Sequence, residues 1–335
     1  MTSSRELIVL PNDTAKPIIA AIDAARGSLK IKMFLFTDPT LIEAVTKARG
    51  RGVDVRIMLN PARRSGEAEN VATRKALERA GIDVADSNPA FELTHEKSMI
   101  VDDSIAFVKS LNWETRNLTV TRDYAVVTRV PEEVAEIVAG FEADWHRKPF
   151  DPDHSSRLIW CSNNGRARIA HFIDNTKHSL WLQNERYQDT VIIERLVRAV
   201  RRGVKVHLLA RAPHTLKKDK LIEGVGGLRI VQDVGAKVHR PKGLRLHAKM
   251  LLADGERAII GSINLSPGSF DARRELAIET DDVAVVRRLH DIAREDWQAS
   301  SKLDLSDEGL LADLEKGGKG GAEQLVLDGN HREPL

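Results

Sequence analysis

One arrangement of residues occurs twice in this chain of 335 residues, and it constrains the fold more than any other feature. The pattern H-x-K-x-x-x-x-D spans residues 95–102 and returns at residues 247–254, so the copies lie 152 residues apart. On the order of 0.05 chance matches would be expected in a chain with this content of His, Lys and Asp. A Ser-x-Asn follows each copy, at residues 110–112 and 262–264. This duplicated set of side chains indicates chemistry on a phosphate ester.

The duplication extends well beyond the two motifs. Residues 22–23 (Ile-Asp) match residues 173–174, and residues 51–53 (Arg-Gly-Val) match residues 202–204, both at an offset of 151. A nearly constant offset over this length indicates two copies of one structural unit, and the period is too long for a solenoid. Each copy should therefore form a domain.

These repeats set the expected domain boundaries. The first domain is expected over residues 1–150 and the second over residues 151–302, with a Pro- and Asp-rich stretch between them. Residues 303–335 are expected to form a C-terminal helix and a flexible tail, because the sequence KGGKGG at residues 316–321 is typical of linkers.

Strands and helices alternate in each copy. Asp38 and Pro39 are typical of a helix start, and Gly52 of its end. In the first copy we expect strands at 28–36, 53–59, 82–85, 98–101, 105–108 and 124–127, and further helices at 67–80 and 130–146. In the second copy we expect strands at 180–182, 204–210 and 248–253, and helices at 190–202 and 283–299. The predicted fold class is therefore α/β, with two α/β/α sandwich domains related by pseudo-twofold symmetry and one active site at their interface.

Composition narrows the class of protein only slightly. The net charge of +2 argues neither for nor against a polyanionic partner. A single cysteine, Cys161, excludes an internal disulfide framework and a cysteine-based metal cluster. The N-terminus lacks a signal peptide pattern, and no window approaches 18 uninterrupted apolar residues. The expectation is a cytoplasmic protein, with a peripheral contact to the membrane if its substrate is a lipid.

The two motifs can supply a complete set of catalytic groups. If each motif lies on a strand, His95 and Lys97 project from one face, and His247 and Lys249 do the same. Packing the halves about a twofold axis would bring all four together. One His could attack phosphorus while the other protonates the leaving oxygen, without a metal or other cofactor. Charge on the equatorial oxygens would be held by the ammonium and amide groups of Lys97, Lys249, Asn112 and Asn264.

Each histidine also needs a partner that orients its second ring nitrogen. Asp123 and Glu275 each lie 13 residues after the Ser of the Ser-x-Asn in their own half, in matching surroundings. A carboxylate at an equivalent place in both halves is the natural candidate for this role. The alternative is that both are ordinary surface carboxylates at strand ends.

These motifs resemble the signature of the phospholipase D superfamily, a pair of H-x-K-x4-D motifs, each followed by G-S-x-N, and the resemblance covers roughly residues 5–300. It implies that one motif histidine forms a phosphohistidine intermediate and that the other is the general acid. We assign the nucleophile to His95 and the general acid to His247, although the symmetry of the motifs leaves the reverse assignment open. It also implies that Ser110 and Ser262 line the substrate site. The motif residues Asp102 and Asp254 more often brace the fold. One departure is Lys109, which stands where the family has a glycine and puts the oxygen-binding geometry of the first half in question.

The resemblance leaves the substrate open. The first hypothesis is a hydrolase or phosphatidyltransferase that acts on phospholipids, similar to bacterial cardiolipin-synthase-like proteins, for which one chain would suffice as a monomer. The alternative is a nuclease of the same superfamily that cuts DNA or RNA, although neither a basic track nor many aromatic residues are evident. A third class is an inactive binding module, against which the two complete motifs argue.

Overall fold

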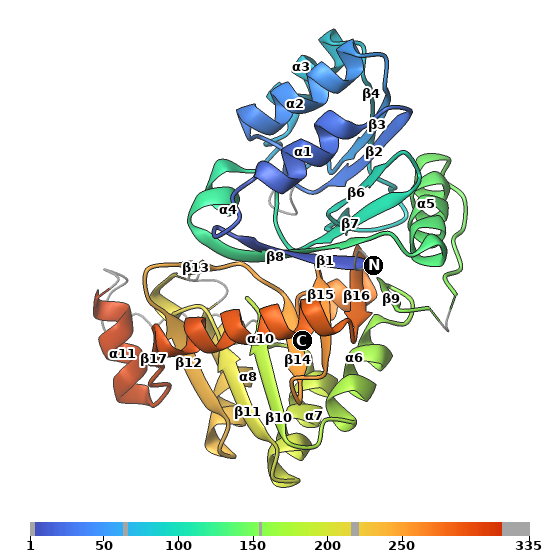
Figure 1. The fold of residues 1–335 in the computed structure, drawn as a ribbon. Helices are drawn as coiled ribbons and strands as arrows, with labels where there is room; N and C mark the ends of the chain where they lie inside the picture. The colour runs from blue at the N-terminus through green and yellow to red at the C-terminus, as the bar shows by residue number, and fades with distance from the viewer. Residues whose placement is uncertain (1–3, 63–65, 154–155, 216–220, 317–335) are drawn as a thin grey trace.

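The computed structural model describes residues 4–62, 66–153, 156–215 and 221–316. Figure 1 shows two lobes stacked one above the other, which correspond to the two sequence repeats. The elements of the first lobe are β1 (Arg5–Leu10), α1 (Lys16–Ala24), β2 (Ser28–Met33), α2 (Pro39–Gly50), β3 (Asp54–Leu59), α3 (Val71–Arg79), β4 (Asp83–Asp86), β5 (Leu93–Thr94), β6 (Ser98–Val101), β7 (Ile105–Lys109), α4 (Thr115–Thr119), β8 (Thr121–Thr128) and α5 (Pro131–Trp145).

The second lobe repeats this order. Its elements are β9 (Leu158–Cys161), α6 (Gly165–Asp174), β10 (Ser179–Gln183), α7 (Thr190–Arg201), β11 (Lys205–Leu209), a 3-10 turn (Pro213–Thr215), α8 (Leu221–Asp233), β12 (Lys237–Pro241), β13 (Arg245–Leu246), β14 (Met250–Ala253), β15 (Arg257–Gly261), α9 (Pro267–Asp271), β16 (Arg273–Thr280), α10 (Val283–Gln298), β17 (Ser300–Lys302) and α11 (Asp307–Lys316). The flexible tail expected from the sequence lies beyond residue 316, outside the described residues.

Each lobe is built on one mixed sheet. The strand order in the first is β1-β8-β7-β6-β2-β3-β4, and in the second it is β9-β16-β15-β14-β10-β11-β12 followed by β17. The same mixture of directions occurs in both sheets. Strand β2 is parallel to β3 and antiparallel to β6. Strand β10 is likewise parallel to β11 and antiparallel to β14. The described elements confirm the predicted α/β class and its internal duplication.

Equivalent aspartates start equivalent helices in the two lobes. The Asp38 carboxylate accepts hydrogen bonds from the backbone N–H groups of Thr40 and Leu41 at the start of α2. Asp189 accepts one from Ile192 at the start of α7. Such caps satisfy N–H groups that have no partner within the helix. The predicted start of α2 is therefore confirmed.

Helix α3 begins later than its sequence predicts. The sequence suggests a helix from residue 67, but the structure begins it at Val71. The side chain of Asn70, the residue before the helix, is bonded to other parts of the lobe. It accepts from the Phe36 backbone N–H at 2.9 Å. It also donates to the carbonyls of Phe34 and Asn60, at 2.8 and 2.9 Å. These bonds tie the chain to the ends of β2 and β3 before the helix can start.

The second half of each motif lies on a strand as predicted, on β6 and on β14, but the His and Lys lie before that strand. Residues 95–97 and 247–249 are irregular, and each follows a two-residue strand. Strand β5 pairs with β16 of the second lobe, and β13 pairs with β8 of the first. The prediction is wrong for these residues because their backbone N–H groups form hydrogen bonds to the other lobe. Those of His95 and Glu96 both donate to the Arg274 carbonyl at 2.9 Å.

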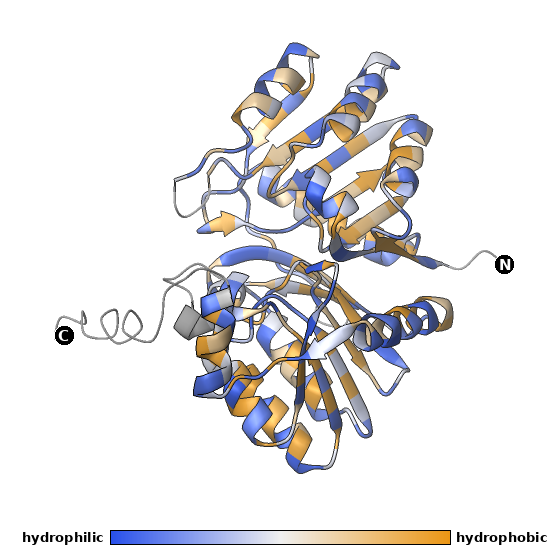
Figure 2. Cartoon of the chain, turned by 90° about the vertical axis from the view of Figure 1, so that its left-hand side faces the viewer, coloured by the Kyte–Doolittle hydropathy of each residue, from blue (hydrophilic) through white to orange (hydrophobic). Residues whose placement is uncertain are grey.

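The apolar cores explain why the lobes form one body. The core around α1, α2 and α3 belongs to the first lobe, and the core around α6, α7 and α8 belongs to the second. Between them lies a shared core with buried residues from both lobes, among them Tyr124, Phe141, Trp160 and Leu289. Figure 2 shows long apolar stretches on the strands, while the outer helices alternate between apolar and polar residues. The inner faces of the two sheets, together with α5 and α10, are thus buried against each other.

Candidate active site

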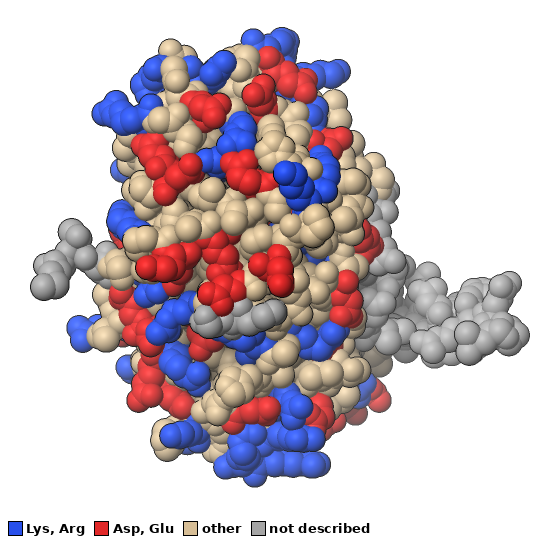
Figure 3. Space-filling model, turned by 90° about the vertical axis from the view of Figure 1, so that its right-hand side faces the viewer, with Lys and Arg blue, Asp and Glu red and all other residues tan. Residues whose placement is uncertain are grey.

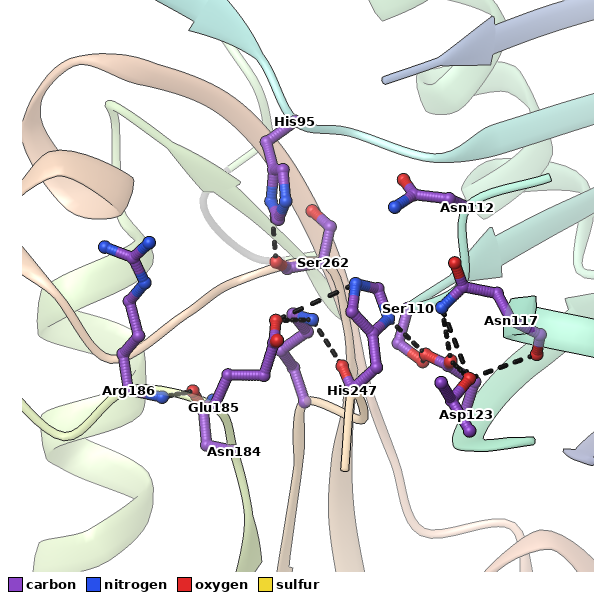
Figure 4. A network of polar contacts seen from close by, with 12 residues as sticks. His95, Ser110, Asn112, Asn117, Asp123, Asn184, Glu185, Arg186, His247 and Ser262 are labelled. Atoms are coloured by element: carbon purple, nitrogen blue, oxygen red, sulfur yellow. Dashed lines mark hydrogen bonds and ion pairs between the residues drawn. The ribbon is translucent and has the colours of Figure 1, made fainter. Parts of the chain in front are cut away.

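Both motif histidines lie at the interface between the lobes (Figure 4). Nδ1 of His95 lies 3.0 Å from Oε2 of Glu275 and 3.2 Å from the Ser262 carbonyl oxygen, both in the second lobe. Nδ1 of His247 lies 2.8 Å from Oδ1 of Asp123, in the first lobe. Each imidazole is therefore held by a carboxylate from the opposite half of the chain. This bond fixes the ring so that Nε2 is the nitrogen left for a substrate.

Asp123 is itself held by neutral donors. Its Oδ1 accepts from Ser110 Oγ at 2.6 Å, and its Oδ2 accepts from Asn117 Nδ2 at 3.1 Å and from Thr121 Oγ1. Figure 4 shows this group gathered beside His247. Ser110 thus contributes to the site by fixing the carboxylate. The sequence analysis did not single out Asn117 or Thr121, although both lie within six residues of Asp123.

The two motif lysines lie close to their histidines. Nζ of Lys97 donates to the His95 carbonyl, and Nζ of Lys249 donates to the His247 carbonyl. Both side chains are almost fully buried. The structure therefore brings together the two His and two Lys that the sequence predicted to converge, although strand alternation does not produce the arrangement.

The two motif asparagines are buried in equivalent places. Asn112 and Asn264 are each 4% exposed, and in each the amide Oδ1 has no hydrogen-bond partner among the described residues. Ser262 is fully buried, and its Oγ accepts from the Leu276 backbone N–H at 3.1 Å. The Asn112 amide nitrogen donates to Glu114 at 3.2 Å. A buried amide oxygen that lacks a partner in both halves is typical of a polar site that a ligand completes.

The half-sites differ at one position that the sequence analysis missed. In the first half Phe34 lies edge-on to His95, with ring centroids 5.0 Å apart. In the second half Glu185 accepts from Lys249 Nζ at 2.7 Å and lies 3.7 Å from His247 Nε2. The match between Asp38 and Asp189 could have revealed this pair, because Phe34 and Glu185 each lie four residues before those aspartates.

Burial shifts the pKa values of the first half-site toward the neutral forms of its side chains. Burial, together with the charges of Lys97 and Lys249, holds the pKa of His95 well below 6.5. Burial and the Lys249 charge lower the pKa of Lys97 to about 7. The pKa of Glu275 is raised, mainly by burial.

The carboxylates of the second half-site are held in the charged form. Burial alone would raise the pKa of Asp123, but His247 and Lys249 outweigh it and leave that pKa below its usual value. Burial acts against Glu185 as well, yet Lys249, His247 and Arg211 depress the pKa of this carboxyl. The second half-site is therefore the more anionic of the two.

The motif aspartates lie away from these groups. Asp102 accepts hydrogen bonds from the backbone N–H groups of residues 26–28, at 2.7 to 3.2 Å. Asp254 accepts from residues 177–179, at 2.7 to 2.9 Å. Each therefore ties the end of a motif strand to the turn before the first strand of the parallel pair. These contacts agree with a structural role for both residues.

Lys109 has a side chain at a position where its counterpart in the second half, Gly261, has no room for one. In the second half a Cβ on Gly261 would lie 2.3 Å from the Leu276 carbonyl oxygen, so the backbone requires glycine there. In the first half the fully buried Lys109 side chain packs with Nζ 4.5 Å from the ring centroid of Trp113. Ser110 keeps its bond to Asp123 despite this substitution. Trp113 is itself fully buried and belongs to the apolar core of the first lobe.

Among the described residues, no group of three or more His, Cys, Asp or Glu side chains is arranged to hold a metal ion. The arrangement can instead bind a phosphate group between two imidazoles, two ammonium groups and two amides.

Comparisons with known proteins identify the relatives of this fold. A family model described as "Cardiolipin synthase, PLD-like domain" matches residues 18–145 and 169–297. The chain is 25% identical to a polyphosphate kinase from Vibrio parahaemolyticus, over 86% of this chain and 42% of that protein. It is 33% identical to the human mitochondrial cardiolipin hydrolase, over 40% of this chain and 51% of that protein. The chain thus spans about half the length of these curated relatives.

A solved structure supports the fold along the whole chain. The crystal structure of a phosphatidylserine synthase from Haemophilus influenzae matches with a TM-score of 0.70, at 11% sequence identity. The match covers 96% of this chain and 94% of that one. At this identity the match shows a common fold.

Proposed function

Because the chain belongs to the phospholipase D superfamily, we propose that it is a metal-independent phosphodiesterase that hydrolyses or transfers the phosphatidyl group of phospholipids. The observation that carries the proposal is the pair of imidazoles, each bonded at Nδ1 to a carboxylate of the opposite half. This geometry leaves two Nε2 atoms, one to attack phosphorus and one to protonate the leaving oxygen.

We assign the nucleophile to His95. Attack requires a lone pair on Nε2, and the lowered pKa of His95 keeps its ring neutral near pH 7. The Asp123 carboxylate lies 2.8 Å from His247 Nδ1 and is itself held in the charged form, so it stabilises positive charge on the His247 ring. A protonated ring is what a general acid needs. The asymmetry of the half-sites thus supports different roles for two histidines in equivalent motifs.

The reaction then takes two steps. Nε2 of His95 bonds to phosphorus as the bond to the leaving oxygen breaks, and His247 gives its proton to that oxygen. Water or an alcohol next gives its proton to His247 and bonds to phosphorus, and the electron pair of the P–N bond returns to His95. Charge on the equatorial oxygens is held by the side chains of Lys97, Asn112, Lys249 and Asn264.

Two observations favour a lipid over a nucleic acid as the substrate. The family model is described by a cardiolipin synthase, and the human relative is named for cardiolipin hydrolysis. The net charge of the chain is only +2, and on the face shown in Figure 3 Lys and Arg are interspersed with Asp and Glu, whereas a nucleic-acid backbone favours clustered basic residues. No helix in the described part of the chain is long and apolar enough to span a bilayer. Contact with the lipid is proposed to be peripheral, and one chain supplies both half-sites.

Parallel activity assays in excess chelator test this proposal. One assay uses vesicles of phosphatidylglycerol or phosphatidylcholine, and the other uses single- and double-stranded DNA. The expected result is lipid turnover that is lost in His95→Ala and in His247→Ala but retained in the control His171→Ala, a surface histidine on α6. DNA cleavage lost in the two motif variants would assign a nuclease instead. Activity that survives both motif substitutions would overturn the two-histidine mechanism.

A further inference from the structure

Phe34 and Glu185 occupy equivalent positions in the two halves. Phe34 directly follows β2, and Glu185 lies two residues beyond the end of β10. Two residues further on, Phe36 forms a β-bridge with Trp113, and Tyr187 forms the matching bridge with Leu265. The backbone therefore follows the same path past both histidines. The side chains placed beside them are chemically opposite.

The first half-site is apolar at this position. The Phe34 ring lies edge-on to His95, and its centroid is 5.3 Å from Lys97 Nζ. Phenylalanine can accept no hydrogen bond from a molecule that approaches this imidazole. Beside His95 the site thus excludes competing polar partners, which suits a nitrogen that must attack phosphorus.

The second half-site places a hydrogen-bond acceptor beside His247. Oε2 of Glu185 and Nε2 of His247 lie 3.7 Å apart, which is too far for a direct hydrogen bond. One water oxygen at about 2.8 Å from each atom would bridge them. A carboxylate has about four acceptor sites, so the bonds to Lys249 and Arg211 leave capacity for such a water.

We propose that Glu185 is a water-positioning residue, which directs the covalent intermediate toward hydrolysis and toward acceptors that carry a second hydroxyl group. This inference rests on the proposed function and deepens it. Water has two O–H groups, of which one can face His247 Nε2 and the other Glu185 Oε2. A monohydric alcohol has one O–H group, and it must be given to His247.

The charge around Glu185 favours neutral partners. Lys249 Nζ lies 2.7 Å away and an Arg211 guanidinium nitrogen 3.3 Å away, so two cations already balance the carboxylate. A third cation, such as an amino alcohol would bring, gains little there. A hydroxyl donor needs only an open lone pair. The second hydroxyl of a diol can therefore replace the second proton of water.

The second step shows where the residue acts. A water proton passes to His247 Nε2, the water oxygen bonds to phosphorus, and the P–N bond breaks with its electron pair returning to His95. Glu185 accepts the other water proton as a hydrogen bond and keeps its own charge throughout. It therefore orients the nucleophile without gaining or losing a proton.

Product partitioning tests the inference, because water and alcohol compete for one intermediate and their product ratio is independent of how fast that intermediate forms. Vesicles of phosphatidylglycerol would be incubated with the full chain in buffer that contains 1-butanol or glycerol, with bis(4-nitrophenyl) phosphate as a second diester. Hydrolysis and transfer products would be measured by phosphorus NMR. The variants are Glu185→Gln, which keeps the shape, and Glu185→Phe, which reproduces the other half-site.

In Glu185→Phe we expect the ratio of hydrolysis to butanol transfer to fall roughly 10- to 100-fold, the effect of losing one hydrogen bond to a charged group. The preference for glycerol over butanol should fall with it, and Glu185→Gln should lie between. The matched control is Glu133→Gln, a buried carboxylate that accepts from Arg5 and Thr128. Turnover with an unchanged ratio in both variants would overturn the role of Glu185. Absence of turnover of either diester by the unmodified chain would refute the proposed function itself, and this inference with it.

Discussion

The Arg274 guanidinium of the second lobe donates from Nε to Oδ2 of Asp144 in the first lobe, at 2.8 Å. The repeat mirrors this bond, because Arg122 of the first lobe forms a bidentate pair with Asp296 of the second, at 2.7 and 2.8 Å. Each arginine directly precedes the carboxylate that orients a motif histidine. The bonds that join the lobes therefore also help to position the carboxylates that bond the motif histidines.

Substitution of Arg274 should destabilise the whole chain. Arg274 is 1% exposed, and Asp144 is buried with it, so Arg274→Met removes one partner of a buried ion pair. Such a change typically costs about 3–5 kcal/mol of unfolding free energy, because it leaves the other charge poorly compensated. Urea denaturation should show this loss, with the exposed Arg116→Met as a control that leaves stability unchanged. A change near zero would mean that Lys32, 2.6 Å from Asp144, compensates that carboxylate alone.

The repeat in the sequence predicted most of the candidate site. The motif pairs and the carboxylates Asp123 and Glu275 could be predicted because each has a counterpart at a nearly constant offset. The exchange of β5 and β13 between the sheets could not be found, since a two-residue strand carries no periodicity. Glu185 could not be predicted from residue matches in the repeat, because its counterpart in the first half is Phe34 and the two residues do not match.

The acceptor character of Asp123 should control the tautomer of His247. Asp123→Asn presents either an amide N–H or a weaker oxygen to Nδ1, so the bond that orients the ring is impaired. We expect kcat to fall by about 10²- to 10⁴-fold while the fold is retained. Since Glu275 plays the equivalent part in the other half, Asp123→Glu should restore part of the activity. Steady-state kinetics with circular dichroism as a folding check would measure both, and a full rate in Asp123→Asn would exclude an orienting role.

The alkaline limb of kcat/KM should report Lys97. Its pKa is lowered to about 7, so in the free enzyme the ammonium group loses its proton as the pH rises through that value. Phosphate binding weakens when the charge is lost, and kcat/KM should fall above about pH 7. Arginine stays charged in this range, so Lys97→Arg should move the limb to higher pH. A limb that stays in place in Lys97→Arg would assign it to another group.

The acidic limb should lie at unusually low pH. The pKa of His95 is held well below 6.5 by burial and by the charges of Lys97 and Lys249. Protonation, which would remove the nucleophilic lone pair, therefore requires a lower pH than it does for a free imidazole. Lys249→Met removes one of these charges and should move the acidic limb upward in pH. The measurement is kcat/KM from pH 4 to 7, and an acidic limb already complete at pH 6.5 in the unmodified chain would contradict the assignment of His95 as nucleophile.

Replacing Lys109 should stabilise the chain at neutral pH. Lys109 Nζ is fully buried without a hydrogen-bond partner among the described residues, and desolvation holds its pKa well below 10.5. Above this lowered pKa the folded chain contains a neutral amine, whereas the unfolded chain carries an ammonium ion up to the ordinary pKa of lysine. Lys109→Met keeps the volume and removes the unsatisfied group, and the unfolding free energy at pH 7 should rise by about 1–3 kcal/mol.

The pH dependence of stability distinguishes this cause from a simple gain in packing. At a pH between the pKa of Lys109 in the folded chain and its pKa in the unfolded chain, the unfolded state binds one proton more than the folded state. The unfolding free energy of the unmodified chain should therefore increase with pH in that range. Lys109→Met should remove this slope, and the advantage of the variant should be smaller at pH 9 than at pH 7. Urea denaturation at both pH values would measure it, with the exposed Lys47→Met as the control. A variant less stable than the unmodified chain at pH 7 would show instead that the amine is charged and stabilised by the Trp113 ring, 4.5 Å away.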